Sequence, residues 1–238
     1  MALQPPDQER IVELAEAQLA ERPGDDTAHE RLARALLALG RLEDAERHAA
    51  DAVRLDPDEV RYRELLAQVL AALGAHRDAA NEFARLALRD PRQVAWTLAE
   101  AVERLEGDEL ASSVEAARRA ARLAPDNADA QLTLARGLTQ MGDGPAALQA
   151  ATRAVELRPG DAAQREALAD ALWLNDGAAA ALAVYQRLAG ELAGEAATRV
   201  TAKARTLYRQ RSAGAGRAVA SVGWLFAVAF RRGWLRLE

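Results

Sequence analysis

Residues 60–93 read VRYRELLAQVLAALGAHRDAANEFARLALRDPRQ, and this stretch of 34 residues sets the pattern for most of the chain. Its proline, Pro91, stands 34 residues after Pro57 and 34 residues before Pro125, and Pro159 continues the series. Each of these prolines follows a short segment rich in apolar residues and arginine, which is typical of the end of a helix. A strict period of this length predicts a solenoid of stacked helical hairpins, in which each unit packs only on its neighbours.

Alignment on the prolines divides the repetitive part of the chain into five units. The first helix of a unit carries a Leu-Ala pair and another leucine three residues later, as in Leu66, Ala67 and Leu70, which puts the apolar residues on one helical face. Gly74 then supplies the positive φ that ends a helix, and Ala79 is the small residue expected where the two helices cross. The units are 26–59, 60–93, 94–127, 128–161 and 162–195.

These units resemble the tetratricopeptide repeat family in length, in order and in residue type. The family pattern has a small residue in the first helix, here Ala33 or Ala67, an alanine in the second, here Ala45 or Ala79, and a closing proline. The resemblance covers residues 26–195. It implies an all-α fold, a right-handed α-solenoid of helical hairpins with capping helices. It also implies a non-enzymatic interaction scaffold or adaptor.

The sequence departs from the family pattern in two places. The position where the family commonly has a bulky residue holds His29, Arg63, Thr97, Gln131 and Arg165 in the successive units. In the third unit, Glu100 replaces a leucine and Asp108 stands where the other units have glycine, with Gly107 beside it. The apolar face of that first helix is otherwise kept, so we expect a repeat with shifted packing and a local distortion of the superhelix.

Single helices are predicted at both ends of the repeats. Residues 8–21 carry apolar residues on one face and predict an N-terminal capping helix within residues 1–25. Residues 196–211 predict a C-terminal capping helix, with Val200, Ala204, Leu207 and Tyr208 at helical spacing. Three acidic residues beside the turns between units are candidates for capping the next helix: Asp58, Asp126 and Asp161.

In tetratricopeptide-repeat proteins the first helices line the concave face, so the resemblance places a partner-binding surface there. The carried-over positions are acidic at the two ends and apolar in the third and fourth units, which suits a helix or an extended peptide with basic ends. Trp173 is the candidate aromatic anchor, with packing on a neighbouring helix as the alternative. The predicted residues are Glu30, Arg34, Glu64, Gln68, Leu98, Val102, Leu132, Arg136, Glu166, Asp170 and Trp173.

The C-terminal tail, residues 212–238, differs from the rest of the chain in charge and in hydrophobic pattern. Nine basic residues and one acid follow from Arg199 onward, whereas the rest of the chain is acidic. Residues 212–216 predict a flexible break, and residues 217–237 have the pattern of a basic amphipathic helix. Its uncharged stretch would be about 20 Å long as a helix, too short to span a bilayer. The candidate docking residues are Val219, Val222, Trp224, Phe226, Phe230, Arg231, Arg232 and Trp234.

Three interpretations of this tail stay open. It would dock on an anionic membrane surface, fold back into the groove of its own array or of another copy, or pack as a final helix of the solenoid. The second interpretation includes self-association. Nucleic-acid binding is not expected, because the arginines surround an apolar helix and form no recognisable motif.

Composition argues against catalysis. The chain has no cysteine, which removes disulfides and thiolate metal sites. The three histidines, His29, His48 and His76, fall in different repeat contexts without metal-ligand spacing, and no phosphate-binding glycine motif is present. We therefore expect no catalytic, metal or cofactor site.

The function expected from the sequence is a scaffold that binds a protein or peptide on the concave face. The alternatives are a peripheral membrane scaffold tethered by its C-terminal helix, and an accessory or regulatory subunit of an enzyme. The absence of a secretory signal at the N-terminus leads us to expect a cytoplasmic protein, in the second case at the inner face of the membrane.

Overall fold

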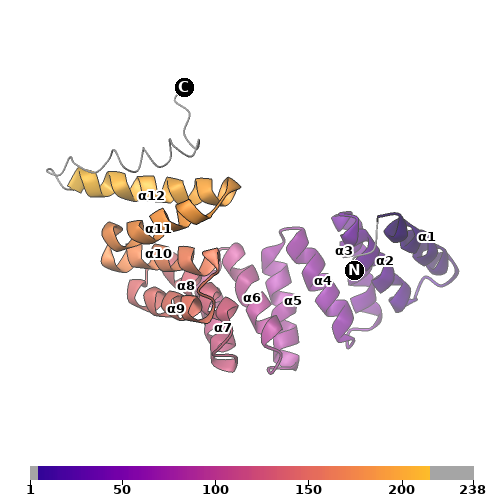
Figure 1. The fold of residues 1–238 in the computed structure, drawn as a ribbon. Helices are drawn as coiled ribbons and strands as arrows, with labels where there is room; N and C mark the ends of the chain where they lie inside the picture. Colours follow the sequence, from indigo (N-terminus) through magenta and orange to yellow (C-terminus); the bar gives the residue numbers. More distant parts are fainter. Residues whose placement is uncertain (1–4, 215–238) are drawn as a thin grey trace.

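A computed structural model describes residues 5–214 and leaves the tail residues 215–238 outside the described part. Within residues 5–214 the chain forms twelve α-helices and no strand, so the predicted all-α solenoid is confirmed (Figure 1). The helices are α1 (Pro5–Glu21), α2 (Asp26–Ala38), α3 (Leu42–Leu55), α4 (Val60–Ala72), α5 (His76–Arg89), α6 (Val94–Glu106), α7 (Leu110–Leu123), α8 (Ala128–Met141), α9 (Gly144–Leu157), α10 (Ala162–Asp176), α11 (Ala178–Glu191) and α12 (Gly194–Gly214).

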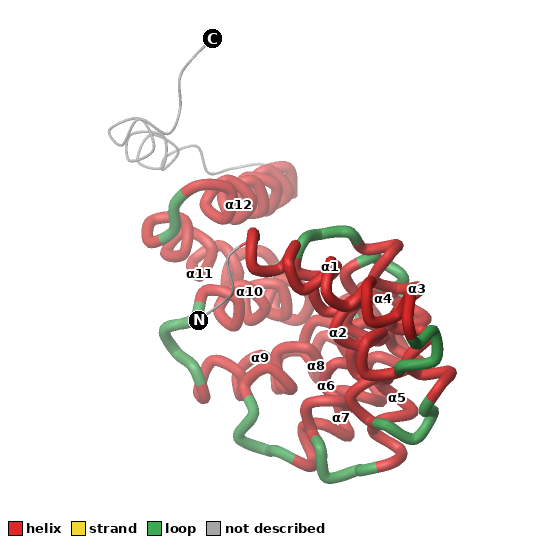
Figure 2. The backbone as a smooth tube through the Cα atoms, turned by 90° about the vertical axis from the view of Figure 1, so that its right-hand side faces the viewer, coloured by secondary structure: helices red, strands yellow, loops and turns green. Residues whose placement is uncertain are grey.

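The helices follow one another along an elongated array, and each packs on the next (Figures 1 and 2). Three pairs of first helices also contact each other directly, α2 with α4, α6 with α8 and α8 with α10, whereas α4 and α6 are not in comparable contact. No two second helices are in comparable contact within residues 5–214. The first helices therefore line the inner side of the array.

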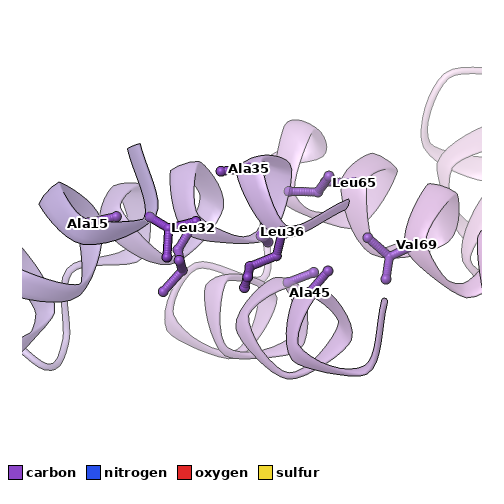
Figure 3. Close-up of a cluster of buried hydrophobic side chains, with 10 residues drawn as sticks. Ala15, Leu32, Ala35, Leu36, Ala45, Leu65 and Val69 are labelled. Carbon is purple, nitrogen blue, oxygen red and sulfur yellow. The ribbon is translucent and has the colours of Figure 1, made fainter. Parts of the chain in front are cut away.

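Alanine dominates the core between the helices. Ala45, Ala79, Ala147 and Ala181, the small residues predicted for the helix crossings, are all fully buried. Around them lie larger aliphatic side chains such as those of the first cluster, where α1, α2, α3 and α4 meet (Figure 3). Small residues at the crossings let helix axes approach closely, and the larger residues fill the space above and below.

The turns between units show which polar residues start the helices. Asp161 accepts a hydrogen bond from the Ala163 amide (2.8 Å) and caps α10. Asp58 and Asp126 do not have the predicted role, because Glu59 caps α4 and Asn127 caps α8. The cap is thus the residue directly before the helix, one position beyond each of these two aspartates.

The two terminal helices are longer than predicted. Helix α1 begins at Pro5, before the predicted start at residue 8, since proline is tolerated in a first helical turn. Helix α12 continues to Gly214 and so includes the first residues of the segment predicted as a flexible break, 212–216. The predicted amphipathic helix and its docking residues lie outside the described part of the chain.

The third unit replaces a glycine turn with a left-handed aspartate. Gly40, Gly74 and Gly142 adopt positive φ as predicted, and at the corresponding place Asp108 has φ 60°. Gly107, directly before it, keeps φ −82°. An aspartate tolerates this conformation better than most residues but pays more for it than glycine does.

We expect Asp108→Gly to stabilise the protein by about 1 kcal/mol, because it removes the steric cost of positive φ at an exposed turn. The urea midpoint of unfolding would measure the effect. The same substitution at Asp58, an exposed turn residue without positive φ, should be neutral or destabilising. Stabilisation of equal size at both positions would contradict the assignment of strain to Asp108.

Gly137 of α8 lies directly against Val114 of α7. A Cβ atom placed on Gly137 would lie 2.8 Å from Val114 Cγ2, and Val114 is itself buried. A β-branched side chain such as valine cannot rotate away easily. The contact therefore leaves no room for a side chain at this position.

We expect Gly137→Val to destabilise the protein by about 2 kcal/mol, since overpacking outweighs the small gain in helix propensity. Gly190, on α11, offers a matched control because a Cβ there meets no atom within 4 Å. Gly190→Val should leave the urea midpoint nearly unchanged. Equal effects of the two substitutions would show that helix propensity, and not packing, decides.

Candidate partner-binding surface

The predicted surface residues lie on the first helices but differ widely in burial and in charge pairing. We call the side of the array formed by α2, α4, α6, α8 and α10 the inner face. Two open depressions, of about 450 Å³ beside Pro125 and about 350 Å³ between α6 and α7, contain none of the predicted residues. The candidate site is therefore a surface and not a pocket.

At the N-terminal end, the acidic residue of the inner face is already neutralised. Glu30 is only 8% exposed and forms an ion pair with Arg34, one turn further along α2. Arg34 itself is exposed. A buried carboxylate is stable only when it is paired, so Glu30 serves the stability of the helix more than it serves an incoming ligand.

In the middle of the array, two charged residues of the predicted surface have no ion-pair partner within residues 5–214. Glu64 on α4 is half-buried and Arg136 on α8 is exposed. Neither forms a salt bridge with another described residue. Gln68, next to Glu64 on the same face, is exposed as well.

Between these two charges, α6 contributes apolar residues. Leu98 and Val102 are half-buried, so part of each side chain remains accessible. Leu132 on α8 differs, because it is buried against Ala154 and Ala167. The apolar part of the inner face is therefore centred on α6, and Leu132 belongs to the core.

At the C-terminal end, α12 covers the two predicted acidic residues. Arg199 Nη2 lies 2.9 Å from Glu166 Oε2, and Lys203 Nζ lies 2.9 Å from Glu166 Oε1 and 2.8 Å from Asp170 Oδ2. Tyr185 also donates a hydrogen bond to Asp170. The sequence predicted an acidic end open to a basic ligand, whereas these carboxylates are paired within the chain.

The electrostatics of this cluster follow from the pairing. Burial alone would raise the pKa of Glu166, but hydrogen bonds from Arg199 and Lys203 hold it below its ordinary value. Burial would lower the pKa of Lys203, yet Asp170 and Glu166 raise it. Glu166 and Lys203 are therefore both charged at neutral pH, and their ion pair helps to hold α12 against α10.

Trp173 packs within the same region. It is half-buried against a cluster that includes Ala181 and Leu188 of α11 and Leu207 of α12. These contacts favour the packing alternative over the role of an aromatic anchor for a ligand.

Ion pairs explain why the third unit has a glutamate where the repeat pattern has a leucine. Glu100, only 5% exposed, pairs with Arg104 on its own helix and with Arg119 on α7. Arg104 also pairs with Glu109, which accepts from Arg77 of the preceding unit. The spacing of Glu100 and Arg104 by four residues was visible in the sequence, but their link to α7 was not.

The histidines are arranged differently from the prediction. His29 and His48, which we expected in separate contexts, have their Nδ1 atoms 3.0 Å apart. His76 lies elsewhere and contacts Glu103 at 2.9 Å. The proximity of His29 and His48 was not apparent from the sequence, because the two residues belong to different helices.

Comparison with known proteins agrees with this architecture. A family model for the tetratricopeptide repeat matches residues 9–69, from α1 into α4. No curated protein matches the chain. The family match within residues 9–69 and the fold shared with solved tetratricopeptide-repeat structures support repeats of the tetratricopeptide type in this chain.

Three of the similar solved structures illustrate the likeness. A tetratricopeptide repeat protein from Parabacteroides merdae has 15% identity and a TM-score of 0.66, covering 82% of this chain and 85% of that one. YrrB, described as a TPR protein with an unusual peptide-binding site, has 15% identity and a TM-score of 0.64, covering 82% and 100%. MamA from Desulfovibrio magneticus RS-1 has 16% identity and a TM-score of 0.63, covering 68% and 92%.

At these identities the likeness carries the fold. Tetratricopeptide repeats in general bind protein or peptide partners and have no catalytic role. Among the helices of residues 5–214, none is both long and apolar enough to cross a membrane.

We expect Lys203→Met to loosen α12, because it leaves Asp170 and Glu166 partly uncompensated, at a cost of about 1–2 kcal/mol. Hydrogen exchange of the α12 amides should become faster. Arg205, exposed on the same helix and without an ion pair in the described part of the chain, provides the control. If Arg205→Met accelerates exchange as much, overall charge, and not the contact with α10, holds the helix.

Proposed function

We propose that this protein is a non-enzymatic scaffold that binds a helical or extended segment of a protein partner across α4, α6 and α8. The observation that carries the proposal is the order of side chains on three successive first helices. Glu64 on α4, an acid without an ion-pair partner in residues 5–214, is followed by the accessible apolar residues Leu98 and Val102 on α6. Arg136 on α8, a base that likewise lacks an ion-pair partner among the described residues, comes next.

The pairing of charges elsewhere supports this placement. The acidic residues at both ends of the inner face are neutralised by arginine or lysine of the chain itself, as Glu30 is by Arg34 and Asp170 by Lys203. Among the residues that the structure describes, the middle of the array therefore offers accessible charges without an ion-pair partner. A ligand that suits it has an apolar centre, a basic residue toward α4 and an acidic residue toward α8.

The two kinds of contact would contribute differently to binding. Exposed ion pairs contribute only about 0–1 kcal/mol each, so the charges mainly fix the orientation of the ligand. Burial of the ligand's apolar residues against α6 would supply most of the affinity. This revises the ligand predicted from the sequence, which had basic residues at both ends.

The membrane-tethered alternative depends on residues 217–237, which lie outside the described residues. It stays a prediction from the sequence. A role as an accessory or regulatory subunit of an enzyme would be a special case of the proposed scaffold, in which the enzyme is the partner.

A phage-displayed library of random peptides, selected on the full chain, tests the proposal. Selected peptides should combine apolar residues with a basic residue on one side and an acidic residue on the other. We expect Arg136→Glu to weaken their binding about tenfold, through loss of one ion pair and gain of a repulsion, as measured by fluorescence anisotropy. Leu98→Asp should weaken it further.

Matched substitutions on second helices serve as controls. Leu88 on α5 is 77% exposed and Arg122 on α7 is exposed, so Leu88→Asp and Arg122→Glu should leave peptide binding unchanged. Circular dichroism would confirm that every variant keeps its helices. Selected peptides that bind wild type and Arg136→Glu equally, or a selection that yields no binding peptide, would overturn the proposal.

A further inference from the structure

One cluster of side chains in the first unit plays no part in the inner face described above. His29 of α2 meets His48 and Asp51 of α3, and each of the three offers a ligand atom within 4.8 Å of the other two. His48 and Asp51 are three residues apart, which places them on the same face of α3. His29 is 7% exposed, and the other two are half-buried.

The hydrogen bonds of His29 determine which of its two ring nitrogens carries the proton and which carries a lone pair. Its Nε2 atom lies 3.2 Å from the Pro23 carbonyl oxygen, and a carbonyl can only accept, so Nε2 carries the proton. In neutral His29 the Nδ1 lone pair therefore points at His48, whose Nδ1 lies 3.0 Å away. A histidine whose second nitrogen donates to a backbone carbonyl is the arrangement in which proteins hold metal-binding imidazoles.

The equivalent positions of the second unit show what the site lacks. Arg63 and Glu82 occupy the places of His29 and His48, and they form an ion pair at 2.7 Å. Arg85, at the place of Asp51, pairs with the same glutamate. The second unit thus contains its own cations, whereas the first unit brings together two imidazoles and a carboxylate.

We propose that His29 Nδ1, a ring nitrogen of His48 and the Asp51 carboxylate bind one divalent transition-metal ion of the Zn²⁺ type. Two imidazole nitrogens bound to one zinc ion at its usual distances lie roughly 3.3 Å apart, close to the separation found here. Two nitrogens and one oxygen form a common ligand set for such ions, with the fourth position left to water.

The surroundings are compatible with a bound cation. Burial, then the neighbouring His29 and Arg47, lower the pKa of His48. Arg54 approaches Asp51 only through Oδ1, and this exposed ion pair contributes little. The second carboxylate oxygen stays available.

A metal ion at this place would connect α2 with α3 and, through the Pro23 carbonyl, with the turn that follows α1. It would therefore stabilise the N-terminal end of the array. This inference is independent of the peptide-binding proposal, because none of its three ligands belongs to the residues of α4, α6 and α8 invoked there.

Zinc titration of the full chain, freed of affinity tags and of metal by chelation, tests the site. Isothermal titration calorimetry should show one Zn²⁺ bound per chain. We expect His48→Asn to weaken binding by at least tenfold and Asp51→Asn to weaken it by about tenfold. His29 is not substituted, because it is buried and its loss would disturb the fold.

The third histidine gives the matched control. His76 pairs with Glu103 outside the cluster, so His76→Asn should keep the affinity of the wild type. The melting temperature should rise with zinc in the wild type and in His76→Asn, but not in His48→Asn. Absence of saturable binding, binding that survives both His48→Asn and Asp51→Asn, or equal loss in His76→Asn would overturn the assignment.

Discussion

The close crossing of the two helices in each unit is the constraint on which the whole array depends. Ala45, Ala79, Ala147 and Ala181 occupy these crossings without any exposed surface. In the third unit Ser113 takes this place, and its hydroxyl donates to the Ala101 carbonyl at 2.7 Å, so no polar group is left unsatisfied. A larger side chain at any of these positions would separate the helices and change how the next unit stacks.

Because the stacking is carried by small residues, the polar positions of each unit are free to differ. The same two positions hold a histidine pair in the first unit and an arginine–glutamate pair in the second. In the third unit a buried glutamate between two arginines replaces a leucine without loss of the hairpin. Burying such charged pairs carries a desolvation penalty that their mutual attraction must offset. Their contribution to the stability of the whole protein is therefore small, and their main effect is on the packing of the helices that they join.

The sequence predicted the fold well because the fold depends on a period. Leucine, alanine, glycine and proline recur at fixed positions, and the helices of the five units follow that pattern, whereas α1 and α12 extend beyond their predicted ends. The helix caps show the limit of this reasoning. Asp58 and Asp126 were expected to cap the next helices, but Glu59 and Asn127, one residue later, do so. A pattern in composition locates a turn, whereas the cap depends on the backbone of a single residue.

The candidate surface was less predictable, because it depends on contacts between helices that the repeat pattern does not encode. The positions of Glu64, Leu98 and Arg136 on first helices follow from the period alone. The pairing of Glu166 and Asp170 with α12 does not follow from the period. It joins residues about one repeat apart, and α12 is the capping helix after the last hairpin. Because of that contact, the acidic residues at the C-terminal end of the inner face are paired within the chain.

The histidine pair shows how a repeat could be used to recover part of this information. His29 and His48 are separated by 19 residues, and so are Arg63 and Glu82. An ion pair between the second two therefore implies proximity of the first two, because equivalent positions in a solenoid occupy equivalent places. Comparing polar residues between units, and not only along the chain, identifies contacts across each hairpin before the structure is known. By the same reasoning, a change of residue at one such position alters a single unit while the alanine crossings keep the array intact.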